Sequence, residues 1–90
     1  MSVEVNIPPF LQPLAGNTRL VNVSGRTVLD CLEELVKRHP ALKFKIFTPK
    51  GELLQGLNIF INGETSYPGA LTRQIRDGDK LHVTYIVMGG

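Results

Sequence analysis

The chain has 90 residues, of which 42% are hydrophobic and 20% are charged, a composition typical of one small globular domain. Its net charge of +2 is too small for a nucleic-acid platform, and its apolar runs are too short to span a bilayer. A single cysteine excludes an internal disulfide framework, and the first residues lack the basic and apolar regions of a signal peptide. We therefore expect a cytoplasmic protein with no nucleic-acid and no membrane partner.

The start of the chain predicts a β-hairpin. Apolar and polar residues alternate over residues 3–7, which is the period of a half-buried strand, and Pro8-Pro9 stops this strand. Residues 10–14 are expected to form an apolar loop or a short turn. A second strand over residues 19–23 then pairs with the first, since Gly16-Asn17 suits a reversal of the chain.

One helix is predicted after the hairpin. Thr27 is a suitable N-cap, and Asp30, three residues later, adds a weak capping box and a favourable charge at the helix start. Apolar residues recur at helical spacing from Val28 to Val36, and charged residues occupy the other side. Pro40 ends the helix.

The second half of the chain predicts further strands joined by turns. Residues 44–47 are ambiguous, and we assign them to a strand that follows a short turn. Residues 57–61 form a clearer strand, closed by the strong turn signal Asn62-Gly63. Asp77-Gly78-Asp79 is another turn, and apolar residues alternate with polar ones in a last strand over residues 81–85.

The order strand, strand, helix and further strands predicts a two-layer α+β fold. A right-handed crossover places the last strand beside the first. This is the β-grasp (ubiquitin-like) arrangement, with a mixed sheet of four to five strands packed on one main helix. We assign residues 1–86 to this domain and residues 87–90 to a flexible C-terminal tail that ends in Gly-Gly.

Few residues of the predicted domain are candidates for catalysis. Cys31 lies beside the apolar stripe of the helix, where a free cysteine is usually a small buried hydrophobe, and nothing places a base beside it. His39 and His82 are the only histidines, so metal-ligand spacing is absent and we expect no metal site. Asp77 and Asp79 flank a glycine, where carboxylates usually satisfy turn backbone groups. The chain alone is therefore not expected to be an enzyme.

The C-terminal residues carry a different signal. After the last strand the chain continues as Ile86-Val87-Met88-Gly89-Gly90, and four extended residues reach roughly 13–14 Å, at about 3.3–3.6 Å each. Glycines can enter a narrow channel and adopt backbone angles that other residues avoid. The group delivered in this way is the α-carboxylate of Gly90, a poor electrophile until adenylation gives it a good leaving group. The alternative interpretation is a frayed end without function.

These features together resemble the ubiquitin-like sulfur-carrier proteins of the MoaD/ThiS family, and most closely its molybdopterin-synthase small-subunit branch. The matching segments cover nearly the whole chain: Val5 to Pro8, Val23 to Val28, Leu32 to Leu42, Asn58 to Gly63, Asp77 to Asp79 with the strand after it, and Gly89-Gly90. Each segment is short, but their order, spacing and end point together are specific. Many molybdopterin-type tails carry a proline shortly before the glycines, whereas this sequence has Ile86-Val87-Met88.

The resemblance implies a sulfur carrier that acts with partner enzymes. An E1-like adenylating enzyme uses ATP and magnesium to adenylate the carboxylate of Gly90, and a sulfurtransferase or other sulfur donor converts it to a thiocarboxylate. An acceptor synthase then takes the sulfur for molybdopterin, thiamin or a sulfur amino acid. The carrier binds no cofactor, and Cys31 takes no part. The alternatives are a ubiquitin-like modifier joined through Gly90 to target lysines, and an interaction module with an inert tail.

The sulfur-carrier interpretation also assigns residues that contact partners. Val87-Met88-Gly89 would thread into the channel of a partner enzyme. Alternation along residues 57–61 turns Phe60 away from its apolar neighbours and towards solvent. Phe60 and Ile86 are then expected to form an apolar patch near the tail to which partners bind.

Overall fold

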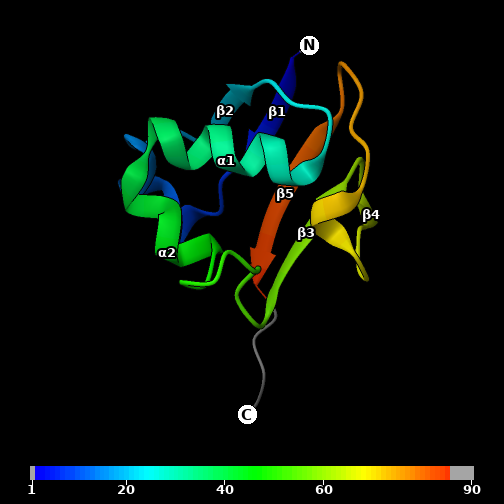
Figure 1. Ribbon diagram of the computed structural model, residues 1–90. Coiled ribbons are helices and arrows are strands. Elements are labelled where there is room, and N and C mark those ends of the chain that lie inside the picture. The colour runs from blue at the N-terminus through cyan, green and yellow to red at the C-terminus, as the bar shows by residue number, and fades with distance from the viewer. Residues whose placement is uncertain (1, 86–90) are drawn as a thin grey trace.

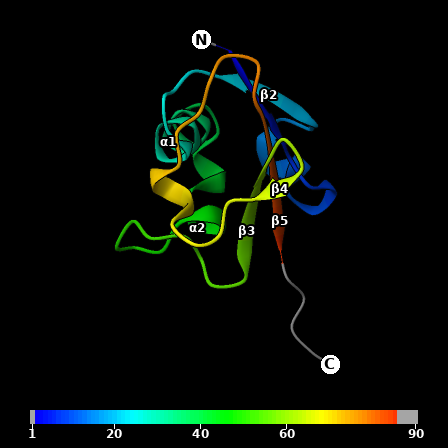
Figure 2. The ribbon, with the colours of Figure 1, turned by 90° about the vertical axis from the view of Figure 1, so that its right-hand side faces the viewer.

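The structure, a computed structural model, describes residues 2–85. Figure 1 shows helices lying across one face of a twisted sheet, and Figure 2 shows the two layers from the side. In chain order the described elements are β1 (Val3–Asn6), η1 (Pro9–Ala15), β2 (Leu20–Val23), α1 (Val28–Arg38), η2 (Pro40–Leu42), α2 (Lys43–Ile46), β3 (Leu57–Ile61), β4 (Glu64–Thr65), η3 (Ala70–Thr72) and β5 (Lys80–Tyr85), where η marks a 3-10 helix.

The five described strands form one mixed sheet in the order β2-β1-β5-β3-β4. β1 pairs antiparallel with β2, with Val5 opposite Val21, and parallel with β5, with Val5 opposite Leu81. β3 pairs antiparallel with β5. The predicted placement of the last strand beside the first is thus confirmed, and so is the β-grasp fold.

The start of α1 follows the predicted cap. The hydroxyl oxygen of Thr27 accepts the backbone N–H of Asp30 at 3.1 Å. The carboxylate of Asp30 accepts the backbone N–H of Arg26 at 3.3 Å, so the reciprocal bond of the capping box goes one residue upstream of the N-cap. Lys37 and Arg38 lie in the last turn of α1, where positive charges interact favourably with the negative end of the helix dipole.

The core lies between the sheet and α1. Leu32 and Leu35 of α1 and Ile59 and Leu81 of the sheet are fully buried, and each such side chain contributes roughly 1.5–3 kcal/mol of hydrophobic stabilisation. α1 is 11 residues long, and among residues 2–85 no helix has both the length and the apolarity needed to cross a membrane.

Two segments differ from the sequence prediction. The strand predicted over residues 44–47 is wrong, because residues 43–46 form the one-turn helix α2. Leu42 and Ile46, one helical turn apart, are both buried, and a short apolar run does not distinguish a strand from a buried helical turn. The apolar loop or short turn predicted over residues 10–14 is part of the 3-10 helix η1, whose proline at its first position presets a helical backbone.

The predicted turns have the expected geometry. Asn62 and Gly63 both have positive φ, 52° and 87°, as a two-residue hairpin turn requires. The carboxylate of Asp79 accepts the backbone N–H of Arg76 at 2.8 Å and the side-chain amide of Asn62 at 2.9 Å. These bonds, the backbone one first, hold the pKa of Asp79 below its usual value. Asp79 thus bonds turn backbone, as predicted, whereas the carboxylate of Asp77 accepts the backbone N–H of Ser2, outside the turn.

Candidate functional site

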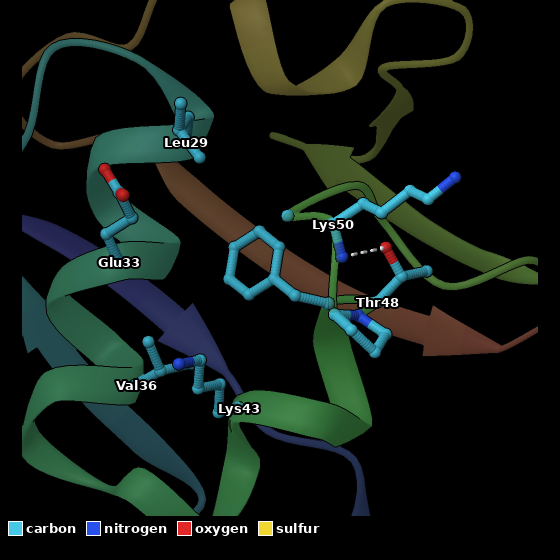
Figure 3. Close-up of a pocket in the computed structure, with 9 residues that line it drawn as sticks. Leu29, Glu33, Val36, Lys43, Thr48 and Lys50 are labelled. Atoms are coloured by element: carbon cyan, nitrogen blue, oxygen red, sulfur yellow. Dashed lines mark hydrogen bonds between the residues drawn. The ribbon is translucent and has the colours of Figure 1, made fainter.

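A groove of about 300 Å³ lies between α1 and the segment that follows α2 (Figure 3). Its charged lining residues are Glu33, Lys43 and Lys50. The hydroxyl of Thr48 accepts the backbone N–H groups of Lys50 at 3.3 Å and Glu52 at 3.2 Å. It therefore caps a turn, and the described lining offers no nucleophile paired with a base. The groove gives no support for a catalytic site.

Cys31 is fully buried in α1, as predicted. Burial, with smaller contributions from the negative charges of Asp30 and Asp79, raises the pKa of its thiol to about 11. Because the nucleophilic form of cysteine is the thiolate, this side chain is inert at neutral pH. The structure thus agrees with a purely structural role for Cys31.

We expect Cys31 to resist alkylation in the folded protein at pH 7 and to react fully in denaturant. The physical reason is that burial excludes the reagent and the raised pKa keeps the thiol protonated. Intact mass after maleimide treatment, with and without denaturant, measures the modified fraction. Rapid labelling of the native chain would contradict the burial, and a Cys31→Ala variant shows that any residual mass shift arises elsewhere.

The two histidines lie apart in the fold. His39 is the C-cap of α1, whereas His82 lies in β5 on the face of the sheet away from the helices. His82 is half-buried because β5 is a central strand, with Asn6 and Phe60 opposite His82 on the two neighbouring strands. Its Nε2 lies 3.2 Å from the side-chain nitrogen of Asn6. Within residues 2–85 no three metal-ligating side chains of the His, Cys, Asp or Glu type come together.

Phe60 is placed on the predicted face of the sheet but is not fully exposed. Its ring is half-buried, with His82 and Thr65 opposite it on β5 and β4. The expectation of a solvent-facing Phe60 is therefore corrected: the residue points to the predicted face but is half-buried, with a strand on each side of it. Ile86, the other member of the predicted patch, lies outside the described residues, and so does the predicted site segment Val87-Met88-Gly89-Gly90.

The sequence prediction missed the exposed large apolar side chains of residues 2–85. Phe10, Phe44 and Tyr67 have 61%, 60% and 76% of their surface exposed. Phe10 lies on η1 next to the end of β5, and its ring centroid is 4.9 Å from that of Tyr85 in an edge contact. This contact joins residues 75 positions apart in the sequence. The only indication that Phe10 points outward is the burial of Leu11 and Ala15 on the other side of η1.

The ThiS family model matches residues 5–90, a range that includes the terminal glycines. The chain belongs to the ThiS family. Small archaeal modifier protein 1 of Haloferax volcanii is 40% identical over 82 residues, which cover 89% of this chain and 91% of that protein. Its crystal structure superimposes with a TM-score of 0.85 at 36% identity and covers 100% of both chains.

Other solved structures place the chain among ubiquitin-like carrier proteins. CysO of Mycobacterium tuberculosis is 30% identical, with a TM-score of 0.85 over 94% of this chain and 99% of that one. A chain of the Amycolatopsis orientalis BexX/CysO complex is 30% identical, with a TM-score of 0.87 over 98% and 99% of the two chains. The resemblance to MoaD/ThiS sulfur carriers is thus confirmed, and the ThiS-family chain has the general role of a ubiquitin-like carrier or modifier.

Proposed function

We propose that the protein is a sulfur carrier whose reactive group is the carboxylate of Gly90. The observation that carries this proposal is the family match, which extends through the terminal glycines. The described part of β5 ends at Tyr85, five residues before Gly90. Five extended residues span up to roughly 16–18 Å, which lets a partner enzyme take the carboxylate while the β-grasp domain stays at its surface.

The chemistry follows from the weakness of a carboxylate as an electrophile. In the E1-like adenylating enzyme, the carboxylate of Gly90 attacks the α-phosphate of magnesium-bound ATP, and pyrophosphate leaves. Sulfide then displaces AMP from the acyl-adenylate and forms a thiocarboxylate; a sulfurtransferase persulfide does the same when a thiol reduces the resulting acyl disulfide. An acceptor synthase removes the sulfur and Gly90 returns as a carboxylate. The acceptor pathway makes molybdopterin, thiamin or a sulfur amino acid.

Docking in this proposal uses the open face of the sheet together with the tail. The partial exposure of Phe60 supports an apolar contact there, to which Ile86 would add. Val87-Met88-Gly89 then passes through the channel of the enzyme, where glycine, which has no side chain, fits the narrowest part.

A second candidate function is conjugation of Gly90 to lysines of other proteins. The observation in its favour is the name of the 40% identical Haloferax relative, a modifier protein. Both functions begin with the same acyl-adenylate and differ in the nucleophile that attacks it, which is sulfur in the carrier and an amine in the modifier.

Intact mass spectrometry distinguishes the two functions. After incubation with an E1-like enzyme, ATP, magnesium and sulfide, we expect the mass to rise by the difference between sulfur and oxygen, and to stay unchanged when ATP is omitted. Adducts with other proteins in a cell lysate, lost when lysines are blocked, would support the modifier. An unchanged mass in the first test and the absence of adducts in the second would contradict both functions.

A further inference from the structure

Phe10 is an exposed aromatic side chain held next to the point where the described chain ends. It is the second residue of η1, and Leu11 and Ala15 of the same helix face the core, which turns the Phe10 ring outward with 61% of its surface exposed. The ring makes an edge contact with Tyr85, at an interplanar angle of 65°. A single exposed apolar residue is common on protein surfaces, but this one borders the last described residue.

Tyr85 is anchored from several sides. Its hydroxyl donates a hydrogen bond to the backbone carbonyl of Lys45 in α2, its ring contacts Phe10, and its backbone lies opposite Leu57 of β3. Burial raises the pKa of Tyr85, so the hydroxyl remains a donor at neutral pH. Figure 1 shows β5 ending at the level of α2, at the lower end of the molecule. The position from which the chain continues towards Gly90 is therefore fixed relative to the Phe10 ring.

The surroundings of this aromatic pair are apolar and cationic. The η1 segment contains no charged residue, and Lys45 of α2, whose backbone carbonyl accepts the hydroxyl of Tyr85, is an exposed cation beside the pair. Electrostatic complementarity between partners requires the opposite sign on the facing surface. The surface that fits the Phe10–Tyr85 pair is therefore an apolar cleft flanked by acidic side chains.

The aromatic pair is also distinct from the open face of the sheet. Phe60 lies opposite His82 of β5, and alternation along a strand puts Tyr85 on the other face, with the buried residues Leu81 and Val83. Gly90 lies only five residues after Tyr85, so an enzyme that binds the carboxylate of Gly90 can reach both faces of the sheet. Phe60 and Phe10 would therefore contact it on opposite sides of the tail.

We propose that Phe10, supported by Tyr85, inserts into an apolar cleft with an acidic rim at the mouth of the channel through which the adenylating enzyme takes the tail. This inference rests on the proposed function, because it presupposes that Gly90 is adenylated. Aromatic side chains at the centre of an interface often carry a large share of the binding free energy. Phe10 thus acts in recognition of the enzyme, whereas the carboxylate of Gly90 undergoes the reaction.

The test compares Phe10→Ser with Phe44→Ser, a matched control of the same residue type, with 60% of its surface exposed and a place in another short helix. ATP–pyrophosphate exchange by the adenylating enzyme is measured against carrier concentration. We expect Phe10→Ser to raise KM about tenfold, equivalent to about 1.4 kcal/mol of binding, with kcat unchanged. Phe44→Ser should stay within about twofold of the wild type, the range typical of a near-neutral surface residue.

Two variants of Phe10 with opposite charges test the acidic rim and show whether a change in KM arises from loss of folding. Phe10→Lys and Phe10→Glu remove the same ring from the same exposed site, so their thermal midpoints serve as mutual controls. We expect Phe10→Glu to raise KM more than Phe10→Lys, because an acidic rim repels the carboxylate. Equal KM values for the two variants would overturn the acidic rim.

The outcomes separate this inference from the proposed function. If the wild-type chain supports no exchange, the proposed function is contradicted. If the wild type is adenylated and Phe10→Ser has the KM of the wild type, the role of Phe10 is overturned and the proposed function stands. A rise in KM for Phe10→Ser alone supports both.

Discussion

Deletion of Gly90 is expected to abolish adenylation while the free energy of unfolding stays within about 0.5 kcal/mol of the wild type, as for other changes away from the core. The buried core of residues 2–85 extends from Val3 to Val83, and we expect a single terminal glycine, which has no side chain, to add little to it. The deletion moves the reactive carboxylate back by about 3.3–3.6 Å, and a misplacement of about 1 Å already costs on the order of 100-fold in rate. ATP–pyrophosphate exchange and urea denaturation measure the two effects.

Two variants show whether position or identity of the terminal residue matters. An alanine appended after Gly90 retains a carboxylate but displaces it by one residue, and we expect the same loss of exchange. Gly90→Ala retains the position and adds one methyl group, so its residual activity reports how narrow the channel is. Normal exchange after the deletion would show that Gly90 is not the activated residue, and unfolding after the deletion would show that the tail supports the core.

The local patterns were sufficient to predict most of the fold. Alternation placed Val5 and Leu81 on the buried face of the sheet, and the Thr27–Asp30 spacing located the helix cap. Both patterns could be read because each depends only on neighbours within a few residues. The helix α2 could not be predicted in the same way. A single helical turn has little intrinsic stability and forms here because Leu42 and Ile46 reach the core together.

The candidate site was less accessible to sequence reasoning. The role proposed for Gly90 came from the family resemblance, since a glycine pair alone has no chemical signature. Alternation gave the direction of Phe60 but not its burial, since the pattern within β3 does not reveal which strands lie beside it. The contact between Phe10 and Tyr85 joins the first helical turn to the last strand, and no periodicity in either segment indicates it.

Replacement of Gly25 by alanine is expected to lower the free energy of unfolding by about 1–3 kcal/mol, the usual cost of overpacking. A Cβ atom at this position would lie 2.8 Å from the Cβ of Asp30 and 2.9 Å from both the backbone nitrogen and the Sγ of Cys31. The first two atoms belong to the first turn of α1 and move only if the helix moves. Such a shift would also strain the cap bond between Thr27 and Asp30.

Urea denaturation of Gly25→Ala, with the exposed neighbour Ser24→Ala as control, measures this cost; a Gly25→Ala chain as stable as the wild type would contradict the close packing. Adding Cys31→Ala removes one of the three close contacts, so the double variant should be more stable than the sum of the single effects by about 0.5 kcal/mol or more. Gly25 lies in the segment Val23 to Val28, one of those that carry the family resemblance. Contact with α1 thus accounts for this glycine, whereas the proposed function accounts for Gly89 and Gly90 through a partner enzyme.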